Sequence, residues 1–240
     1  MSAPLHIFPT LECNGHCPFC AIRPKGLNDE VFRRDRHVGP ERWAEYLSTR
    51  KPEALYITGG EPMLYKYLEV LVNAVSCPTW IYTNGTVKMG RFLLRVDNRK
   101  NLRVRLSFHP HLGFSTAVDA ARALSEAGVE FSLHAVQTSP LVKTWVHRFA
   151  AMGFSLLLDP DFVKIPEWTG GGKVRCHLPN VIVGPDAMVY PCTSKMVRAT
   201  GALYRLDDKR TITIDDEHEC EEPAFCSACD LAFLKRVEHE

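Results

Sequence analysis

The chain has no long hydrophobic run, no excess of one charge and no internal repeat. Its 240 residues carry 29 Lys and Arg against 28 Asp and Glu, a formal net charge of +1. That balance gives no electrostatic footprint for bulk nucleic acid or an anionic membrane. No stretch approaches the roughly 18 apolar residues of a spanning helix, and the first basic residue is Arg23, so no signal peptide is indicated. We therefore expect a cytoplasmic protein without membrane contact.

Cysteine, in contrast, is abundant and unevenly placed. Nine cysteines are present, and none lies in the 98 residues between Cys77 and Cys176. Without a secretion signal, clustered thiols indicate metal or redox chemistry more often than disulfides. The sequence therefore offers two candidate metal sites, one near each end.

Short apolar runs alternate with helical patterns in the first two thirds of the chain. The expected strands are residues 5–10, 54–58, 79–83, 102–109, 129–137 and 154–158. Helices are expected between them, and one of these begins with Pro40 as its first residue. Strands alternating with helices indicate βα units and a parallel sheet. Six units are too few for a closed eight-stranded barrel, so we expect an open, partly curved α/β sheet.

The composition changes after about residue 160. Residues 180–191 are expected to form a β-hairpin that turns at Gly184-Pro185-Asp186, and residues 223–237 are expected to be helical. Because this region is short of apolar residues, a small domain that needs a metal to hold it is plausible. The expected domains are residues 1–160 and 161–240.

Cys13, Cys17 and Cys20 follow the first expected strand with the spacing C-x3-C-x2-C. Three thiolates so close together can face a single centre. A [4Fe–4S] cube held by three cysteines leaves one iron open for a substrate or cofactor, whereas a closed zinc site takes four ligands. His16 is the available fourth zinc ligand, although its place beside Cys17 makes the geometry awkward. The spacing favours an iron–sulfur cluster over zinc or structural thiols.

These cysteines, with the aromatic Phe19 before the last of them, resemble the signature of the radical S-adenosylmethionine (SAM) superfamily. Thr58-Gly59-Gly60-Glu61-Pro62, after the second expected strand, resembles that family's GGE motif. Thr83-Asn84-Gly85, after the third, resembles a further recurring element. Each motif alone could be an ordinary turn, but they occur in order at the ends of successive strands. The resemblance covers residues 5–160 and implies a (β/α)6 partial TIM barrel.

The resemblance also implies a [4Fe–4S] cluster and SAM as cofactors. In such enzymes one electron from the cluster breaks the sulfonium C–S bond of SAM, and the resulting 5′-deoxyadenosyl radical takes a hydrogen atom from the substrate. Glu61 is suited to accept the methionine amine of SAM, and Gly59 and Gly60 let the backbone approach it closely. The SAM-binding residues that the resemblance implies are Phe19, Gly59, Gly60, Glu61, Pro62 and Asn84. A donor such as flavodoxin or ferredoxin is the expected electron source.

Polar residues alternate with apolar ones in two of the expected strands. Ser107 and His109 share one face of the fourth strand, and Ser132 and His134 share one face of the fifth. We expect the apolar faces to meet the outer helices and these four side chains to point into the barrel. Ser107, His109 and His134 would then lie near SAM. The alternative is that the histidines are ordinary core groups with satisfied hydrogen bonds.

The last third of the chain holds the second candidate metal site. Cys176 and Cys192 bracket the expected hairpin, and Cys226 and Cys229 lie in the expected final helix. Four thiolates can close a second [4Fe–4S] site. The pattern resembles the auxiliary-cluster extension, called Twitch or shortened SPASM, of radical SAM enzymes. A four-cysteine zinc ribbon is the alternative.

Two residues of this region depart from a simple assignment. Ala187 stands where the resembled pattern has a glycine, five residues before Cys192. Cys220 is a spare thiol, which is an alternative ligand, a labile ligand or a bystander. Neither residue changes the expected four-cysteine set.

The expected activity is the oxidation of a small molecule, with the auxiliary cluster transferring an electron. The cysteine motif begins only twelve residues from the N-terminus, so we expect no leader-binding domain. A peptide-modifying or peptide-maturing enzyme that acts with a separate partner is the alternative. A non-catalytic iron–sulfur protein is the third possibility, but it would need no GGE motif. The catalytic acid or base stays open, with His134, Asp159 and Asp161 as candidates.

Overall fold

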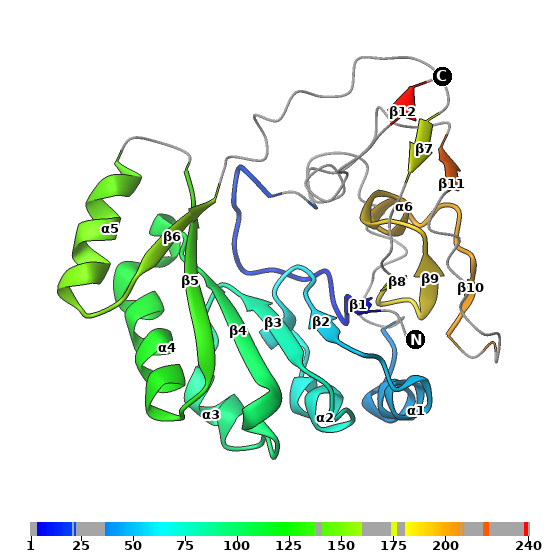
Figure 1. Cartoon of the computed structure of the whole chain (residues 1–240), viewed down its shortest axis with the longest axis horizontal. Coiled ribbons are helices and arrows are strands. Elements are labelled where there is room, and N and C mark those ends of the chain that lie inside the picture. The colour runs from blue at the N-terminus through cyan, green and yellow to red at the C-terminus, as the bar shows by residue number, and fades with distance from the viewer. Residues whose placement is uncertain are drawn as a thin grey trace.

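The computed structural model describes residues 4–20, 22, 37–137, 141–159, 181–206 and 208, and the backbone alone of residues 174–176, 218–220 and 238–239. Within these residues, nine strands form one sheet in the order β10-β9-β8-β1-β2-β3-β4-β5-β6 (Figure 1). The six expected strands are β1 (Leu5–Ile7), β2 (Leu55–Ile57), β3 (Thr79–Thr83), β4 (Leu102–Ser107), β5 (Glu130–Val136) and β6 (Leu156–Asp159).

Every pairing from β1 to β6 is parallel, and a helix precedes each strand after the first. The α-helices are α1 (Pro40–Arg50), α2 (Leu68–Asn73), α3 (Met89–Leu93), α4 (Phe114–Glu126) and α5 (Val142–Ala151), and the 3-10 turns are η2 (Pro62–Leu64), η3 (Arg99–Asn101) and η4 (Pro110–Leu112). Pro40 is the first residue of α1 as expected. The partial-barrel prediction is confirmed. None of these helices is long and apolar enough to cross a membrane.

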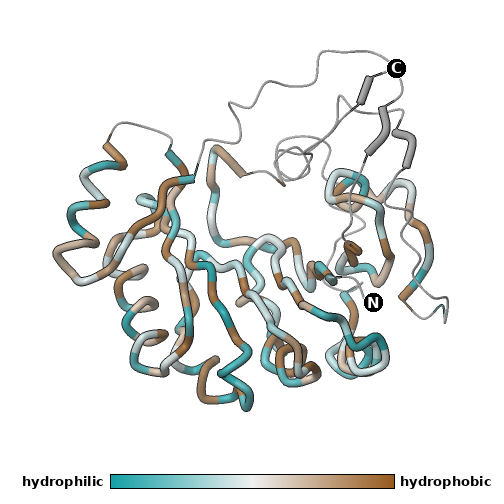
Figure 2. Tube along the Cα trace, viewed as in Figure 1, coloured by the Kyte–Doolittle hydropathy of each residue, from teal (hydrophilic) through white to brown (hydrophobic). Residues whose placement is uncertain are grey.

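The outer face of β1–β6 packs against the helices. Leu102, Val104 and Leu106 of β4 are buried in this core, as their alternation predicted. Phe108 continues the same face and meets Phe149 of α5 with ring centroids 5.0 Å apart. Along α4 and α5, brown and teal segments alternate in Figure 2, because each helix has one apolar side. Hydrophobic burial on this face therefore holds the sheet in place.

A row of stacked side chains crosses the inner face of the sheet. His6, Tyr56, Trp80, Arg103 and Glu130 lie in register on five neighbouring strands. The ring centroids of His6 and Tyr56 are 4.5 Å apart, and those of Tyr56 and Trp80 are 4.8 Å apart. Arg103 lies over Trp80 at 5.0 Å and forms an ion pair with Glu130 at 3.0 Å. Each residue is near the start of its strand, so the row fills the inner face away from the C-terminal loops.

The C-terminal hairpin extends the barrel sheet. β8 (Val181–Val183) and β9 (Met188–Tyr190) pair in antiparallel fashion, so the hairpin prediction is confirmed. β8 also pairs in parallel with β1, with Leu5 opposite Val181 and Ile7 opposite Val183. The division of the chain at residue 160 stays a prediction, but the hairpin shares a sheet with the first 160 residues.

A sixth helix, α6 (Thr193–Arg198), was not expected from the sequence. It packs on the inner face at the β1–β8–β9 end, where its Met196 and Val197 meet Phe8, Ile182 and Tyr190. This small core is separate from the outer one. The sheet is thus covered by helices on both faces at this end.

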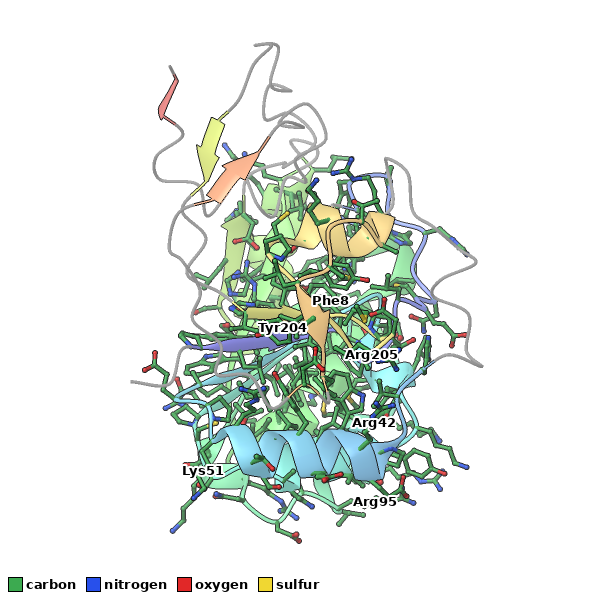
Figure 3. All side chains as sticks on the ribbon, turned by 90° about the vertical axis from the view of Figure 1, so that its right-hand side faces the viewer. Phe8, Arg42, Lys51, Arg95, Tyr204 and Arg205 are labelled. Carbon is green, nitrogen blue, oxygen red and sulfur yellow. The ribbon has the colours of Figure 1, made fainter. Side chains whose placement is uncertain are left out.

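The far edge of the sheet is β10 (Tyr204–Arg205), which faces the viewer in Figure 3 with helix α1 below it. Arg50 at the end of α1 donates a hydrogen bond to the carbonyl of Asp208, at 3.0 Å. The edge strand is only two residues long, and short, charged edge strands resist pairing with other chains.

A second sheet contains β11 (His218–Cys220), β7 (Val174–Cys176) and β12 (Glu238–His239), with β7 in the middle. Its pairings are antiparallel, with Cys176 opposite His218 and Cys220 opposite Val174. Cys176 and Cys220 therefore lie on neighbouring strands. The helix expected over 223–237 lies outside the described residues.

The hairpin turn holds Ala187 in the left-handed region, with φ of 65°. This is the position where a glycine would remove the steric conflict of Cβ, which costs an L-residue roughly 1–2 kcal/mol. We expect Ala187→Val to lower the free energy of unfolding by about 2 kcal/mol or more, because a β-branched residue fits this region worst. Ala187→Gly should stay within about 1 kcal/mol of the parent. Urea unfolding followed by circular dichroism compares them, and equal effects would contradict the turn geometry.

Candidate active site

The motif-bearing loops meet at one edge of the sheet. The cysteine loop follows β1, the GGE segment follows β2, the Thr83-Asn84-Gly85 segment ends β3, and His109 follows β4. Because β1–β6 are parallel, all of these loops leave from the C-terminal edge, where active sites of such folds form. The strand pairing therefore brings the motif-bearing loops to a shared edge.

The two glycines of the GGE segment lie against the backbone of the cysteine loop. A Cβ on Gly59 would be 2.2 Å from the Thr10 carbonyl oxygen, and one on Gly60 would be 2.2 Å from that of Glu12. Gly59 also has φ of +146°. The Gly60 amide donates to Thr10 at 3.1 Å, and the Glu61 amide donates to Glu12 at 2.6 Å. The glycines thus allow two backbones to meet, a role that the sequence analysis did not predict.

Glu61 is buried, with 1% of its surface exposed. Its Oε1 accepts hydrogen bonds from the Met63 amide at 3.0 Å and the Thr83 hydroxyl at 2.7 Å, and its Oε2 accepts one from the Asn84 amide at 2.7 Å. Burial raises the pKa of Glu61, while these three donors act to lower it. The carboxylate joins the GGE segment to the end of β3. Its expected contact with the amine of SAM stays a prediction.

Asn84 connects the β3 end to the cysteine loop. The side-chain Nδ2 of Asn84 donates a hydrogen bond to Asn14 Oδ1 at 2.9 Å. The Nδ2 of Asn14 in turn donates one to Thr86 Oγ1 at 2.6 Å. The backbone amide of Thr86 donates a hydrogen bond to Asn84 Oδ1 at 3.0 Å, which completes the network. Asn14 lies between the first two cysteines, so this network orients the cysteine loop. Nothing in the sequence pattern singled out Asn14 or Thr86.

The thiols of Cys13, Cys17 and Cys20 are half-buried on their loop. The Sγ atoms of Cys13 and Cys17 both lie near Gly15, at 3.5 and 3.4 Å from the position that a Cβ there would take. Cys17 Sγ is also 3.7 Å from His111 Nε2. His111 comes from the loop after β4, and the sequence analysis gave it no role.

The donor set fits the expected cluster. Three half-buried thiolates on one loop are the ligands that a [4Fe–4S] cube takes, and a cube held by three of them keeps one iron open.

Phe19 and His109 lie together beside the cysteines, with ring centroids 5.5 Å apart. Burial, and to a lesser extent the neighbouring His111, lowers the pKa of His109 to about 4, so its ring is neutral at pH 7. His109 Nδ1 is buried and has no hydrogen-bond partner among the described residues. The expected role of Phe19 in binding SAM stays a prediction.

A polar set lies on the inner face of β4–β6. His134 Nδ1 is 3.2 Å from both carboxylate oxygens of Asp159, and its Nε2 is 3.0 Å from Ser132 Oγ. Arg105 forms an ion pair with Asp159 at 2.6 Å. Burial raises the pKa of Asp159, but the His134 hydrogen bond and the Arg105 charge outweigh it and hold the pKa below its ordinary value. The expected pairing of Ser132 and His134 on one face is confirmed.

The remaining predicted residues are placed in part. Pro62 opens η2 and is buried, and Ser107 ends β4 opposite His134. Arg105 was missed, although its alternation with the apolar residues of β4 puts it on the same face as Ser107. Asp161, Cys226 and Cys229 lie outside the described residues.

Cys192 is the one predicted auxiliary ligand whose side chain the described residues include. It is the N-cap of α6, 7% exposed, and its Sγ accepts a hydrogen bond from the Lys195 amide at 3.4 Å. It begins α6, whose Met196 and Val197 lie in the same small core as Phe8, five residues before Cys13. The two candidate cysteine sites are thus linked by packing.

Residues 7–149 match the radical SAM superfamily. The chain belongs to the radical SAM superfamily. This membership indicates an enzyme and implies a [4Fe–4S] cluster and SAM as its cofactors. The recognition made from three short motifs is confirmed at the level of the superfamily.

Solved radical SAM structures share the fold. Native anSMEcpe with bound AdoMet is 18% identical, with a TM-score of 0.64, over 97% of this chain and 82% of that chain. SuiB from Streptococcus suis bound to S-adenosylmethionine is 15% identical, with a TM-score of 0.60, over 87% of this chain and 64% of that chain. SuiB bound to precursor peptide SuiA gives 14% identity and a TM-score of 0.60, over 86% of this chain and 63% of that chain. Comparison with curated proteins finds no match.

The buried Glu61 network gives a test of how the site is held together. Glu61→Ala leaves two amides and one hydroxyl without an acceptor, so the free energy of unfolding should fall by about 3 kcal/mol or more. Thr83→Val removes one of these bonds at similar volume and should cost about 1–2 kcal/mol. Chemical unfolding measures both variants. A smaller loss for Glu61→Ala than for Thr83→Val would show that the carboxylate does not join these loops.

Proposed function

We propose that this chain is a radical SAM enzyme that cleaves SAM reductively and oxidises a substrate bound over the inner face of β4–β6. The observation that carries the proposal is the hydrogen bonding of the cysteine loop to both the GGE segment and the β3 end. This arrangement brings the residues expected to hold the cluster and SAM to one edge. When bound, the cluster and SAM supply a 5′-deoxyadenosyl radical that removes a hydrogen atom from the substrate.

The residues of the site have proposed tasks, and His134 has two of them. Cys13, Cys17 and Cys20 hold the cluster. The SAM site is proposed to consist of Phe19, Gly59, Gly60, Glu61, Pro62, Asn84, Ser107, His109 and His134. Oε1 of Glu61 accepts two hydrogen bonds, whereas Oε2 accepts one. Oε2 therefore has room for a further donor, such as an amine.

His134 is the proposed proton acceptor of the oxidation. Loss of a hydrogen atom and then an electron from an alcohol or amine carbon also requires loss of a proton. Asp159 holds Nδ1 of His134, which leaves Nε2 toward Ser132 and the inner face. A histidine oriented by a carboxylate in this way is suited to general-base catalysis. Asp159 is then a positioning residue, held by Arg105.

An auxiliary [4Fe–4S] cluster held by Cys176, Cys192, Cys226 and Cys229 is the proposed acceptor of the second electron. The position of Cys192 supports this role, because it begins α6, and α6 packs through Met196 and Val197 on Phe8, which leads into the cysteine loop. Cys220 lies on the strand that pairs with that of Cys176, so it is the alternative ligand.

A peptide substrate is the second candidate. Two structures with this fold, anSMEcpe with the Cp18Cys peptide and SuiB with SuiA, have a peptide bound. A search for deuterium transfer from labelled candidate substrates into 5′-deoxyadenosine separates the two classes.

Replacing Cys13, Cys17 and Cys20 together by alanine should abolish formation of 5′-deoxyadenosine, since a methyl group cannot bind iron. Cys77→Ala is the matched control, because that thiol lies before β3 and away from both candidate sites. The assay is anaerobic SAM cleavage with dithionite, followed by chromatography. Product formation at the parent rate by the triple variant would refute the cluster assignment.

Iron content tests the auxiliary site. Two cubes predict about eight irons per chain, and the triple variant should keep about half of them with a broad visible absorbance. Cys220→Ala should keep the full iron content if Cys220 is a bystander. A colourless triple variant that contains zinc instead would make the C-terminal cysteines a structural ribbon.

A further inference from the structure

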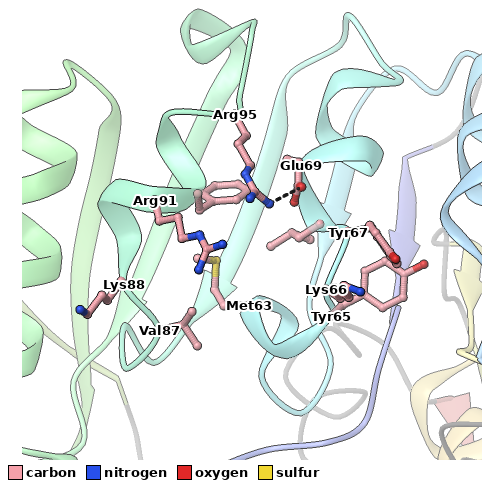
Figure 4. Close-up of a pocket in the computed structure, with 11 residues that line it drawn as sticks. Met63, Tyr65, Lys66, Tyr67, Glu69, Val87, Lys88, Arg91 and Arg95 are labelled. Carbon is pink, nitrogen blue, oxygen red and sulfur yellow. Dashed lines mark hydrogen bonds and ion pairs between the residues drawn. The ribbon is translucent and has the colours of Figure 1, made fainter.

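A basic pocket lies on the outer side of the loops that hold the cysteine loop. It has a volume of about 560 Å³ and is lined by four cations, Lys66, Lys88, Arg91 and Arg95, and one acid, Glu69. Figure 4 shows Arg91 and Arg95 on one side of the pocket and Tyr67 on the other. Among the described residues, Glu69 forms its ion pair with Arg95, at 3.1 Å. In a chain with a net charge of +1, this excess of positive charge is local.

Both walls of the pocket are joined to the cysteine loop. Met63, on one wall, donates its amide to Glu61, and the Glu61 amide donates to Glu12, the residue before Cys13. Val87, on the other wall, follows Thr86, which bonds Asn14. The pocket thus lies behind the loops that would hold the cluster, on the opposite side from the inner face.

The surface around the pocket is typical of a protein interface. A second hollow of about 320 Å³ shares Tyr65, Lys66 and Tyr67 with it and reaches Glu12. Leu64, which lines the second hollow, and Tyr67, which lines both, are exposed by 37% and 38%. An apolar and aromatic centre with a charged rim is how partner proteins are bound.

We propose that this basic surface, formed by Leu64, Tyr67, Lys88 and Arg91 around the pocket, docks an acidic electron-donor protein. The inference rests on the proposed function, because reductive cleavage needs an external electron. For each SAM cleaved, the donor loses one electron and the sulfonium C–S bond breaks, giving methionine and the radical. Charge complementarity selects an acidic partner, and the partly exposed Leu64 and Tyr67 offer apolar contacts that suit a protein better than a small anion.

The test uses the reconstituted holoenzyme with reduced flavodoxin as the probe. Lys88→Glu with Arg91→Glu reverses two exposed charges that belong to neither the cluster site nor the SAM site. Arg122→Glu with Lys143→Glu, on α4 and α5, is the matched control. Each double variant lowers the net charge from +1 by four, to −3.

We expect the pocket variant to bind flavodoxin at least about tenfold more weakly in direct titration, and to lose a similar factor in flavodoxin-driven SAM cleavage. Its cleavage with dithionite should match the parent, and the control variant should match the parent in all three measurements. Increasing ionic strength should weaken the parent's flavodoxin binding and affect the pocket variant less.

Several results would overturn the proposal. Equal losses in both variants would show that only net charge matters, and a loss with dithionite would show structural damage. Tight pyrophosphate binding that the pocket variant loses, with flavodoxin turnover unchanged, would assign the pocket to a small anion. If the parent fails to cleave SAM with dithionite, the proposed function fails first and the docking proposal with it.

Discussion

The close approach of two backbone segments, residues 10–12 and 59–61, is the constraint on which the site depends. Any side chain at Gly59 or Gly60 would collide with carbonyl oxygens at 2.2 Å. The contact between the two segments fixes where the cysteine loop leaves β1. The buried Glu61 carboxylate then binds this loop region to the end of β3, through hydrogen bonds from Thr83 and Asn84. The GGE motif therefore has a structural reason that exists before any cofactor binds. A charge buried so deeply is tolerated because three donors satisfy it.

Much of the fold could be predicted from the sequence, because alternation and helix signals are local. The six parallel strands, the Pro40 helix start and the hairpin at Gly184-Pro185-Asp186 all follow from such patterns. The cysteine spacing and the GGE segment likewise identified the superfamily, since the chemistry of a cluster restricts its ligands. The four side chains assigned to the inner face of β4 and β5 followed from period two alone.

What could not be predicted depends on contacts between distant segments. The Asn14–Thr86 bond joins residues 72 positions apart, and the contact of Cys17 with His111 joins residues 94 apart. The periodicity of apolar residues along a strand or helix does not predict contacts between such distant residues. The helix α6 was missed because it is one short element whose apolar side becomes apparent only against Phe8 and Tyr190. Arg105 is different. Its place on the inner face of β4 could be predicted from the alternation, whereas its ion pair with Asp159 could not.

The pairing of β1 with β8 has a consequence for synthesis of the chain. Synthesis makes β1 before both of its neighbours, and β2 follows it by about fifty residues. The other neighbour, β8, begins with Val181, 176 residues after Leu5. Until β8 is made, one edge of β1 lacks its partner strand, beside the loop that carries three cysteines. Unpaired strand edges invite association with other chains, so early synthesis leaves exposed an edge that the finished sheet covers.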